Sequence, residues 1–283
     1  MKIGITGASG QVGRLVIAHL SKKVAKENLV ALVRNPEKVS DLGIEARAFD
    51  YDKPEQLTVA LNGIDSLLLI SGSEIGKRAQ QHQNVVDAAK NAGVKSITYT
   101  SLLHADTSTL ILAPEHLATE EAIKTSGIAF TLLRNGWYTE NYTASVPGAL
   151  QHGAFIGSAG EGKISSAARN DYAEAAALIV AENNHQGKTL ELSGDEFYTL
   201  TDLAKELSVQ AGKEIPYQNL SENDFAKALE QVGLPEPVAQ VYAGFDTAAS
   251  KGDLYDEGTT LSQLLGRKTT TLSDMIKNTL NHK

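Results

Sequence analysis

The chain contains no cysteine, and this absence removes several classes of chemistry. Without thiols there is no disulfide, no cysteine nucleophile and no cysteine-ligated metal or iron–sulfur centre. The histidines show no paired ligand spacing, so we expect no metal site. No apolar run reaches the roughly 18 residues of a membrane span, and no signal segment precedes the first predicted strand. We therefore expect a cytoplasmic protein with no membrane span.

The chain also has fewer positively charged than negatively charged residues. The 26 Lys and Arg residues are outnumbered by 34 Asp and Glu residues, which gives a formal net charge of −8. A nucleic-acid surface requires clustered Lys and Arg, so we expect no nucleic-acid partner. The sequence also lacks the Gly-x-Ser-x-Gly motif of a hydrolase elbow. A hydrophobic content of 42% is ordinary for a globular chain, and 283 residues suffice for one or one and a half α/β domains.

The feature that is present in strength is a glycine-rich turn near the N-terminus. A short apolar strand, Ile3–Thr6, is followed by Gly7, Gly10 and Gly13 and then by a predicted helix, Arg14–Lys22. In dinucleotide-binding turns the first glycine permits the tight turn, the second lets the backbone approach the pyrophosphate, and the third lets the helix pack on the strand. The free N–H groups of the helix N-terminus then favour an anion. The alternative is a purely structural strand-to-helix turn.

Arg34 indicates which dinucleotide is bound. It ends the second predicted strand, Leu29–Val33, where an acidic residue would bind the ribose 2′-hydroxyl of NAD. A guanidinium there matches the 2′-phosphate of NADP in a bidentate way. We therefore expect NADP(H), with use of NAD(H) left open. The alternative is a solvated charge at the end of a strand.

Apolar runs alternate with helical patterns through the first half of the chain. This alternation predicts an α/β fold with a doubly wound parallel sheet, in which ligands bind beyond the carboxyl ends of the strands. We expect a dinucleotide-binding Rossmann domain at 1–144. A smaller C-terminal α/β substrate-binding part follows at 145–283, interleaved so that some of its elements return to the sheet. The predicted strands are Ile3–Thr6, Leu29–Val33, Glu45–Phe49, Ser66–Ile70, Ser96–Thr100, Phe130–Leu133 and Thr189–Leu192. The predicted helices are Arg14–Lys22, Gln56–Leu61, Arg78–Ala92, Glu115–Thr125, Asn170–Ala181, Thr201–Ala211, Glu222–Val232 and Val238–Lys251, with a polar stretch after them.

The usual catalytic pair of short-chain dehydrogenases, Tyr-x-x-x-Lys on a helix, is missing. On the helix after Ser96–Thr100, His116 and Glu120 take the i and i+4 places. His116 is a candidate weak acid or substrate-orienting group, and the alternative is a surface or capping histidine. Ser101 ends the preceding strand, where a polar group can meet a substrate. A quinone or a cationic dye carbon accepts hydride with little or no help from an acid, so the missing pair favours such acceptors, or a protein that binds NADP without turnover.

Three further segments are candidates for the ligand side of the sheet. The loop after Leu133 carries Trp137, Tyr138 and Asn141, whose aromatic and polar groups are suited to a nicotinamide and a substrate. The alternative for Trp137 is a core aromatic. Gly72, between Ser71 and Ser73, lets the backbone approach the cofactor. Arg169 precedes a helix and is a candidate phosphate contact, with a plain surface arginine as the alternative.

Five motifs together resemble a known family. They are GASGQVG at 7–13, ALVRNP at 31–36, YTSLLHAD at 99–106, LLRNGWY at 132–138 and YQNLS at 217–221. The chain resembles the NmrA-like atypical short-chain dehydrogenase/reductases nearly end to end, and within them the bacterial type 2 NAD(P)H:quinone oxidoreductases. The triphenylmethane dye reductases are a near relative with the same frame.

The resemblance implies an NADPH-dependent oxidoreductase that transfers hydride to small quinones, with no flavin. It also implies Asn141 or a nearby polar group as a substrate contact, and we take Asn141, Tyr138 and His116 as candidate catalytic residues. The alternatives are an NADP(H)-binding redox sensor without turnover and a reductase of triphenylmethane-type dyes. We expect a monomer or a homodimer. The implied cofactor-binding residues are Thr6, Gly7, Ala8, Ser9, Gly10, Gln11, Val12, Gly13, Arg34, Ser71, Gly72, Ser73, Trp137, Tyr138, Thr139, Glu140, Asn141 and Arg169.

Overall fold

A computed structural model describes residues 1–281, so that His282 and Lys283 lie outside the described residues. The chain divides into two compact units, and each is described by itself. The first unit contains Met1–Asp106, Leu112–Asn135 and Arg169–Leu192, and the second contains Thr107–Ile111, Gly136–Ala168 and the chain from Ser193 onward. The chain therefore passes between the units several times, and a segment well past residue 144 belongs to the first.

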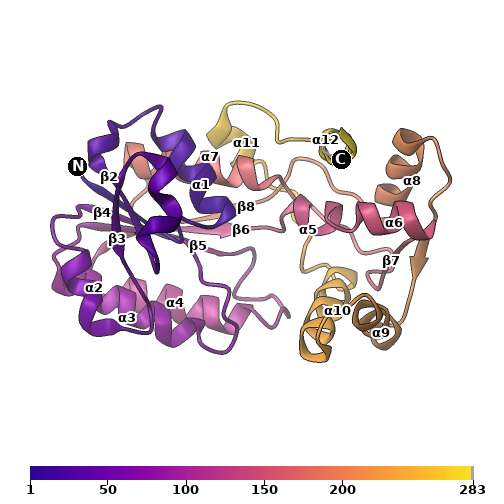
Figure 1. The fold of residues 1–283 in the computed structure, drawn as a ribbon, viewed down its shortest axis with the longest axis horizontal. Coiled ribbons are helices and arrows are strands. Elements are labelled where there is room, and N and C mark those ends of the chain that lie inside the picture. The colour runs from indigo at the N-terminus through magenta and orange to yellow at the C-terminus, as the bar shows by residue number, and fades with distance from the viewer. Residues whose placement is uncertain (282–283) are drawn as a thin grey trace. The chain divides into compact units, whose positions relative to one another are not determined.

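The first unit is built on a seven-stranded sheet in which every pairing is parallel (Figure 1). The strand order is β3-β2-β1-β4-β5-β6-β8, so the chain reverses its direction of travel between β1 and β4. This order confirms the predicted doubly wound α/β class. The strands are β1 (Ile3–Thr6), β2 (Leu29–Val33), β3 (Glu45–Ala48), β4 (Ser66–Leu69), β5 (Ser96–Leu102), β6 (Ala129–Asn135) and β8 (Lys188–Leu192).

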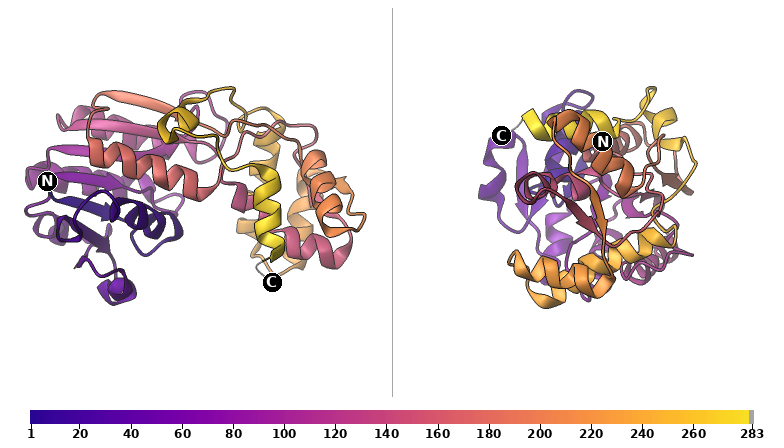
Figure 2. Two further views of the ribbon diagram at one scale, coloured as in Figure 1. Left: turned by 90° about the horizontal axis from the view of Figure 1, so that it is seen from above. Right: turned by 90° about the vertical axis from the view of Figure 1, so that its right-hand side faces the viewer.

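Helices cover both faces of this sheet. Helices α1 (Gln11–Leu20) and α7 (Arg169–Glu182) lie side by side on one face, and α7 is seen lying over the strands from above (Figure 2, left). Helices α2 (Pro54–Ala60), α3 (Arg78–Asn91) and α4 (Ala113–Thr125) lie on the other face (Figure 1). Short 3-10 turns, η1 (Lys26–Asn28) and η2 (Pro36–Leu42), flank β2.

Burial explains why most of these strands are continuously apolar. Every residue of β1, β2, β4 and β5 is buried, as expected for strands covered on both faces. The edge strand β3 differs, because its residues are half-buried or exposed. There Glu45 accepts hydrogen bonds from Lys2 Nζ at 2.6 Å and Arg47 Nε at 2.7 Å. Charged side chains on an edge discourage pairing with another chain.

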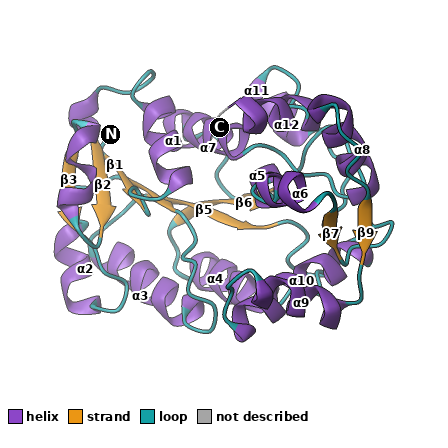
Figure 3. Cartoon of the chain, turned by 45° about the vertical axis from the view of Figure 1, so that its right-hand side comes forward, coloured by secondary structure: helices purple, strands orange, loops and turns teal. Residues whose placement is uncertain are grey.

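The second unit is mostly helical, with β7 (Phe155–Gly157) and β9 (Tyr217–Asn219) pairing in parallel (Figure 3). The sequence did not indicate these strands, because three residues are too few for a periodic pattern. Its helices are α5 (Thr139–Thr143), α6 (Val146–His152), α8 (Leu200–Ala211), α9 (Glu222–Gln231), α10 (Glu236–Ser250), α11 (Thr260–Leu265) and α12 (Leu272–Asn281).

Two expectations about elements need correction. The predicted polar stretch at the C-terminus contains α11 and α12, and α12 packs against α8 and α5. Only Ile276 of α12 is buried, and so narrow an apolar stripe is easily read as polar. The first helix begins at Gln11 rather than Arg14, because Gly13 lies in its first turn instead of in the loop.

Candidate functional site

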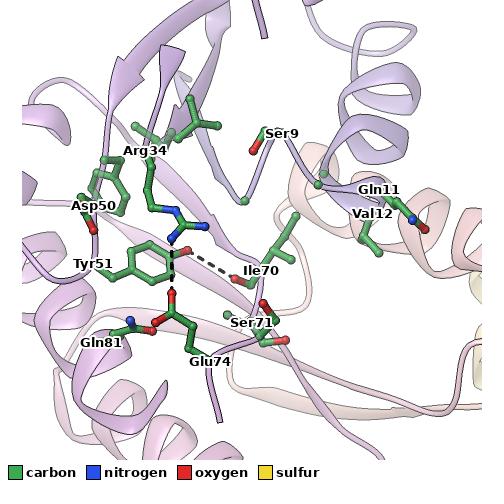
Figure 4. A pocket seen from close by; sticks show the side chains of 18 of the residues that line it. Ser9, Gln11, Val12, Arg34, Asp50, Tyr51, Ile70, Ser71, Glu74 and Gln81 are labelled. Atoms are coloured by element: carbon green, nitrogen blue, oxygen red, sulfur yellow. Dashed lines mark hydrogen bonds and ion pairs between the residues drawn. The ribbon is translucent and has the colours of Figure 1, made fainter. Parts of the chain in front are cut away.

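A cavity of about 390 Å³ opens at the carboxyl ends of β1, β2 and β4, where the direction of the chain reverses. In parallel α/β sheets this is where ligands bind. Figure 4 shows Ser9, Gln11 and Val12 on one side of the cavity and Arg34, Asp50, Tyr51, Glu74 and Gln81 on the other. The residues that line it are Gly7, Ser9, Gly10, Gln11, Val12, Gly13, Leu32, Val33, Arg34, Phe49, Asp50, Tyr51, Ile70, Ser71, Gly72, Ser73, Glu74, Gln81 and Arg169.

The glycine-rich turn has the geometry that the sequence predicts. Gly7 adopts φ +59°, which only glycine adopts readily, and its carbonyl accepts the Gly10 N–H at 2.9 Å. A Cβ on Gly13 would lie 2.3 Å from Gly7 O and 2.7 Å from Ala8 Cα, so the helix packs against the turn only if residue 13 has no side chain. The strand, the turn and the helix are therefore fixed together by two of the three glycines.

Gly10 is less crowded by the protein than Gly13 is, and it has a different role. A Cβ on Gly10 would meet only Gly7 O, at 3.2 Å. As the N-cap of α1, Gly10 has no side chain to bond the first N–H groups of the helix, and no acidic residue lies in the first turn. These N–H groups and the helix dipole suit the site to an anion. The residues present therefore fit a pyrophosphate.

Arg34 lies at the mouth of the cavity, with its side chain 76% exposed. Its Nη1 lies 3.5 Å from Glu74 Oε1, the contact drawn in Figure 4. The sequence indicated Arg34 but not Glu74, which follows the predicted Ser71–Ser73 loop by one residue. A phosphate at Arg34 and the carboxylate of Glu74 would compete for the same guanidinium.

Other lining residues, which were not among the predicted cofactor contacts, follow the third strand or lie in the helix after the fourth. Asp50 and Tyr51 follow β3, and Gln81 lies in α3. The Tyr51 hydroxyl donates to Ile70 O at 3.5 Å, and burial raises the pKa of Tyr51 to about 12. The available signal was position, because Asp50 begins one of the loops at the carboxyl edge of the sheet.

His116 of α4, the candidate weak acid, makes its contacts inside the core. His116 is 4% exposed, does not line the cavity, and its Nδ1 lies 2.7 Å from the Tyr99 hydroxyl. Burial, followed by the charge of Arg78, lowers the pKa of His116 to about 3, so the ring is neutral at physiological pH. It is therefore neither a surface nor a capping histidine but a core residue.

Glu120 and Ser101 belong to a buried ion-pair network. The Ser101 hydroxyl donates to Glu120 Oε1 at 2.6 Å, and Arg134 donates to both Glu120 oxygens at 2.9 Å. Arg134 also donates to Glu191 Oε1 at 2.8 Å. Burial opposes the charge of Glu120, but the hydrogen bond and charge of Arg134 prevail and lower the pKa of this carboxyl. Such a fully paired group holds β5, β6 and α4 together rather than facing a substrate.

The aromatic and polar loop after β6 belongs to the second unit. Thr139 N–H donates to Ala167 O at 3.0 Å, and Ala167 N–H donates to Trp137 O at 3.1 Å. The ring of Trp137 packs edge-on against Phe245, with 5.1 Å between centroids. These contacts fix the loop within its own unit, so its approach to a cofactor stays a prediction.

The sequence-predicted cofactor residues therefore fall into three groups. The first group lines the cavity and consists of Gly7, Ser9, Gly10, Gln11, Val12, Gly13, Arg34, Ser71, Gly72, Ser73 and Arg169, which is the first residue of α7. Thr6 and Ala8 are buried beside it without lining it. The third group, Trp137, Tyr138, Thr139, Glu140 and Asn141, lies in the second unit.

Within residues 1–281, no group of three or more His, Asp or Glu side chains is placed to hold a metal ion. None of the helices in this part of the chain is both long and apolar enough to cross a membrane.

Comparison with known proteins agrees with this geometry. A family model described as NAD(P)H-binding matches residues 7–183. Quinone oxidoreductase 2 of Escherichia coli K12 is 57% identical over 282 residues, which cover 99% of each chain. The crystal structure of NADPH-dependent quinone oxidoreductase QOR2 from Escherichia coli with NADPH superposes with a TM-score of 0.96, at 57% identity, over 99% of this chain and all of that one. Triphenylmethane reductase of Citrobacter sp. with NADP(H) gives a TM-score of 0.95 at 40% identity, over 98% of this chain and all of that one.

Proposed function

The chain belongs to the NAD(P)H-binding family, and from this premise we propose that it is an NADPH-dependent oxidoreductase that transfers hydride to small quinones. The observation that carries the proposal is the cavity itself. The glycine-rich turn, the uncapped N-terminus of α1 and Arg34 all line it. The turn and the helix N-terminus suit a pyrophosphate, and Arg34 suits a 2′-phosphate. A relative that is 57% identical over 99% of its length carries the name of a quinone oxidoreductase.

Each part of the cavity has a separate task in this proposal. The backbone of Gly10 and the first turn of α1 hold the pyrophosphate, and Arg34 holds the 2′-phosphate. The Ser71–Ser73 loop would bind the ribose or the nicotinamide, and Arg169, which also lines the cavity, would add a positive charge. When bound, NADPH supplies the hydride.

The proton balance of the reaction favours a quinone as acceptor. His116 and Glu120, which occupy the places of the usual tyrosine and lysine, are both buried and bonded. A quinone needs no strong acid at the moment of hydride transfer, since its reduced form can take a proton from water. In this proposal Asn141 and Tyr138 orient the quinone, and His116 serves the packing around Tyr99.

The test is NADPH oxidation, followed by absorbance, with a panel of small quinones and with NADH in parallel. Rapid quinone-dependent oxidation that favours NADPH supports the proposal. Faster turnover of cationic dyes than of quinones would favour the dye reductase, to which the 40% identity with triphenylmethane reductase points. Tight NADPH binding without oxidation by any acceptor would favour the redox sensor. A cytoplasmic location and a monomeric or homodimeric state stay predictions.

A further inference from the structure

The loop from Ser71 to Gly76 lines the cavity at its first four residues, and both of its ends are tied to side chains that do not line the cavity. At one end, Ser71 N–H donates to Thr100 Oγ1 at 2.9 Å. At the other end, Gly76 N–H donates to Glu115 Oε1 at 3.1 Å. The loop has neither helix nor strand hydrogen bonds over Ser71–Ser73, so side chains must satisfy its backbone.

Gly72 is held on both sides of its backbone. Its N–H donates to His82 Nε2 at 3.0 Å, and its carbonyl accepts from Arg78 Nε at 2.7 Å. His82 is fully buried and Arg78 is 4% exposed. Arg78 Nη1 also lies 3.1 Å from Glu115 Oε2, so the carboxylate that binds Gly76 also pairs with the arginine that binds Gly72. Three side chains on α3 and α4 thus form one connected clamp.

The hydrogen-bond chain behind His82 fixes its tautomer. The Thr119 hydroxyl donates to Glu115 O at 2.8 Å, so its oxygen is left to accept from His82 Nδ1–H at 3.0 Å. Nε2 of the neutral ring is then an acceptor, as the Gly72 N–H requires. Burial, and after it the charge of Arg78, lowers the pKa of His82 to about 3. The ring therefore stays in the accepting form across the physiological range.

Neither crowding nor strain explains this arrangement. A Cβ on Gly72 would meet its nearest atoms, Gln81 Oε1 and His82 Nε2, at 3.6 Å, which is ordinary contact. The clamp therefore acts on the backbone position of the loop, not on the space around it. A loop held before a ligand arrives loses less conformational entropy when it binds.

We propose that His82, Arg78 and Glu115 are positioning residues that hold the Ser71–Gly76 loop in the conformation that binds the dinucleotide. The inference rests on the proposed cofactor site, but it does not depend on the acceptor that is reduced. Because the clamp binds the backbone of Gly72 and Gly76, and Glu74 is the residue of this loop that lies beside Arg34, we expect the clamp to act on NADPH and NADH alike.

The test compares His82→Leu, which removes the acceptor, with His82→Gln, whose amide oxygen can replace Nε2. Binding of NADPH and NADH is measured by calorimetry without quinone, and exchange of the Gly72 amide is measured by hydrogen–deuterium exchange. We expect His82→Leu to weaken both dinucleotides about tenfold, the usual effect of one lost hydrogen bond, and to speed exchange at Gly72. We expect His82→Gln to restore most of the dinucleotide affinity and most of the protection of the Gly72 amide from exchange.

Ser96→Ala is the matched control. In the unaltered protein the Ser96 hydroxyl donates a buried 3.0 Å hydrogen bond to Ser66 Oγ. Both serines lie at the amino ends of their strands, β5 and β4, whereas the loop follows the carboxyl end of β4. This variant tests whether the loss of any buried hydrogen bond weakens dinucleotide binding. We expect Ser96→Ala to bind NADPH and NADH as tightly as the unaltered protein does. If His82→Leu does not fold, Glu115→Ala takes its place, since it frees Gly76 from a side chain that is 15% exposed.

Three results would overturn the inference. They are unchanged binding in a folded His82→Leu variant, a loss no larger than that of Ser96→Ala, and a loss confined to NADPH. Failure of the unaltered protein to bind either dinucleotide would overturn the cofactor site and this inference with it. Absence of quinone turnover, in contrast, would count against the proposed reaction and leave the clamp standing.

Discussion

Arg34 is the residue that we expect to distinguish the two nicotinamide dinucleotides. It stands at the mouth of the cavity with an exposed guanidinium, placed for a bidentate contact with a 2′-phosphate. Arg34→Ala should raise the KM for NADPH by about tenfold to a hundredfold, equivalent to about 1.5–3 kcal/mol for a lost charge-assisted bond. The KM for NADH should change little, because NADH has no 2′-phosphate.

The measurement is steady-state kinetics with each cofactor at saturating quinone. Lys23→Ala removes an exposed positive charge after α1 and serves as the control. Equal effects of Arg34→Ala on the two cofactors would contradict its role in reading the phosphate.

Glu74 should oppose Arg34 in that task. Its carboxylate lies 3.5 Å from the guanidinium and would repel a bound 2′-phosphate. Glu74→Gln should therefore lower the Kd for NADPH about twofold to fivefold, since exposed ion pairs are worth about 0.2–1 kcal/mol. The Kd for NADH should stay the same, and the gain should shrink as salt is added.

Calorimetric titrations at low and high ionic strength would measure this effect. Glu121→Gln, which removes an exposed carboxylate of α4, is the control. Weaker NADPH binding in Glu74→Gln would show that the carboxylate assists the cofactor instead of competing with it.

At the scale of elements, the close packing of the glycine-rich turn on α1 depends on Gly13. A methyl group there would lie 2.3 Å from a backbone oxygen, and no flexible side chain can move aside to relieve the contact. Gly13→Ala should lower the free energy of unfolding by about 1–3 kcal/mol or more, the cost of overpacking. Denaturant unfolding without cofactor is the measurement.

Gly244→Ala is the control, because Gly244 lies inside α10 and a Cβ there would meet nothing within 4 Å. It should be neutral or stabilising by about 0.5–1 kcal/mol, since alanine favours a helix over glycine. A Gly13→Ala variant as stable as the unaltered chain would mean that the turn can move away from α1.

At the scale of the whole molecule, stability should depend on the buried carboxyl of Asp246. It joins distant segments of the second unit by accepting from the Tyr142 hydroxyl at 3.2 Å and from Ser158 N–H at 2.9 Å. Burial raises its pKa to about 6, with these two hydrogen bonds opposing the shift. Because the folded pKa lies above the ordinary value of 3.8, the folded state holds the proton more tightly than the unfolded state between about pH 4 and 6.

The contribution of Asp246 should therefore be most favourable below about pH 4 and be lost as pH rises through 6. The loss is about 2–3 kcal/mol for a shift of this size. Chemical unfolding of the unaltered protein and of Asp246→Asn across this range would measure it. The stability of the variant relative to the unaltered protein should rise with pH, and a difference that does not vary with pH would show that Asp246 titrates normally.

Local patterns were sufficient for much of the first unit. The alternation of apolar runs and helical patterns predicted its parallel sheet, and the spacing of Gly7, Gly10 and Gly13 predicted a tight turn, which the backbone of Gly7 and Gly10 forms. The boundaries were less accurate, as the early start of α1 shows. In the second unit α8, α9 and α10 were predicted to within two residues, whereas β7, β9 and the helices α5, α6, α11 and α12 were not. Strands of three residues are too short for a periodic pattern, and they are stabilised by pairing between distant segments.

The fold class, the glycine-rich turn and the arginine after the second strand could be predicted from the sequence alone, because each depends on residues close together in the chain. The folded structure was needed to show that Glu74 lies beside Arg34, that His116 is a core residue, and that His82 accepts the Gly72 N–H. These facts depend on side chains that meet across strands and helices. The physical reason is that spacing sets local conformation, whereas burial and pairing are set by the partners that the folded chain brings together.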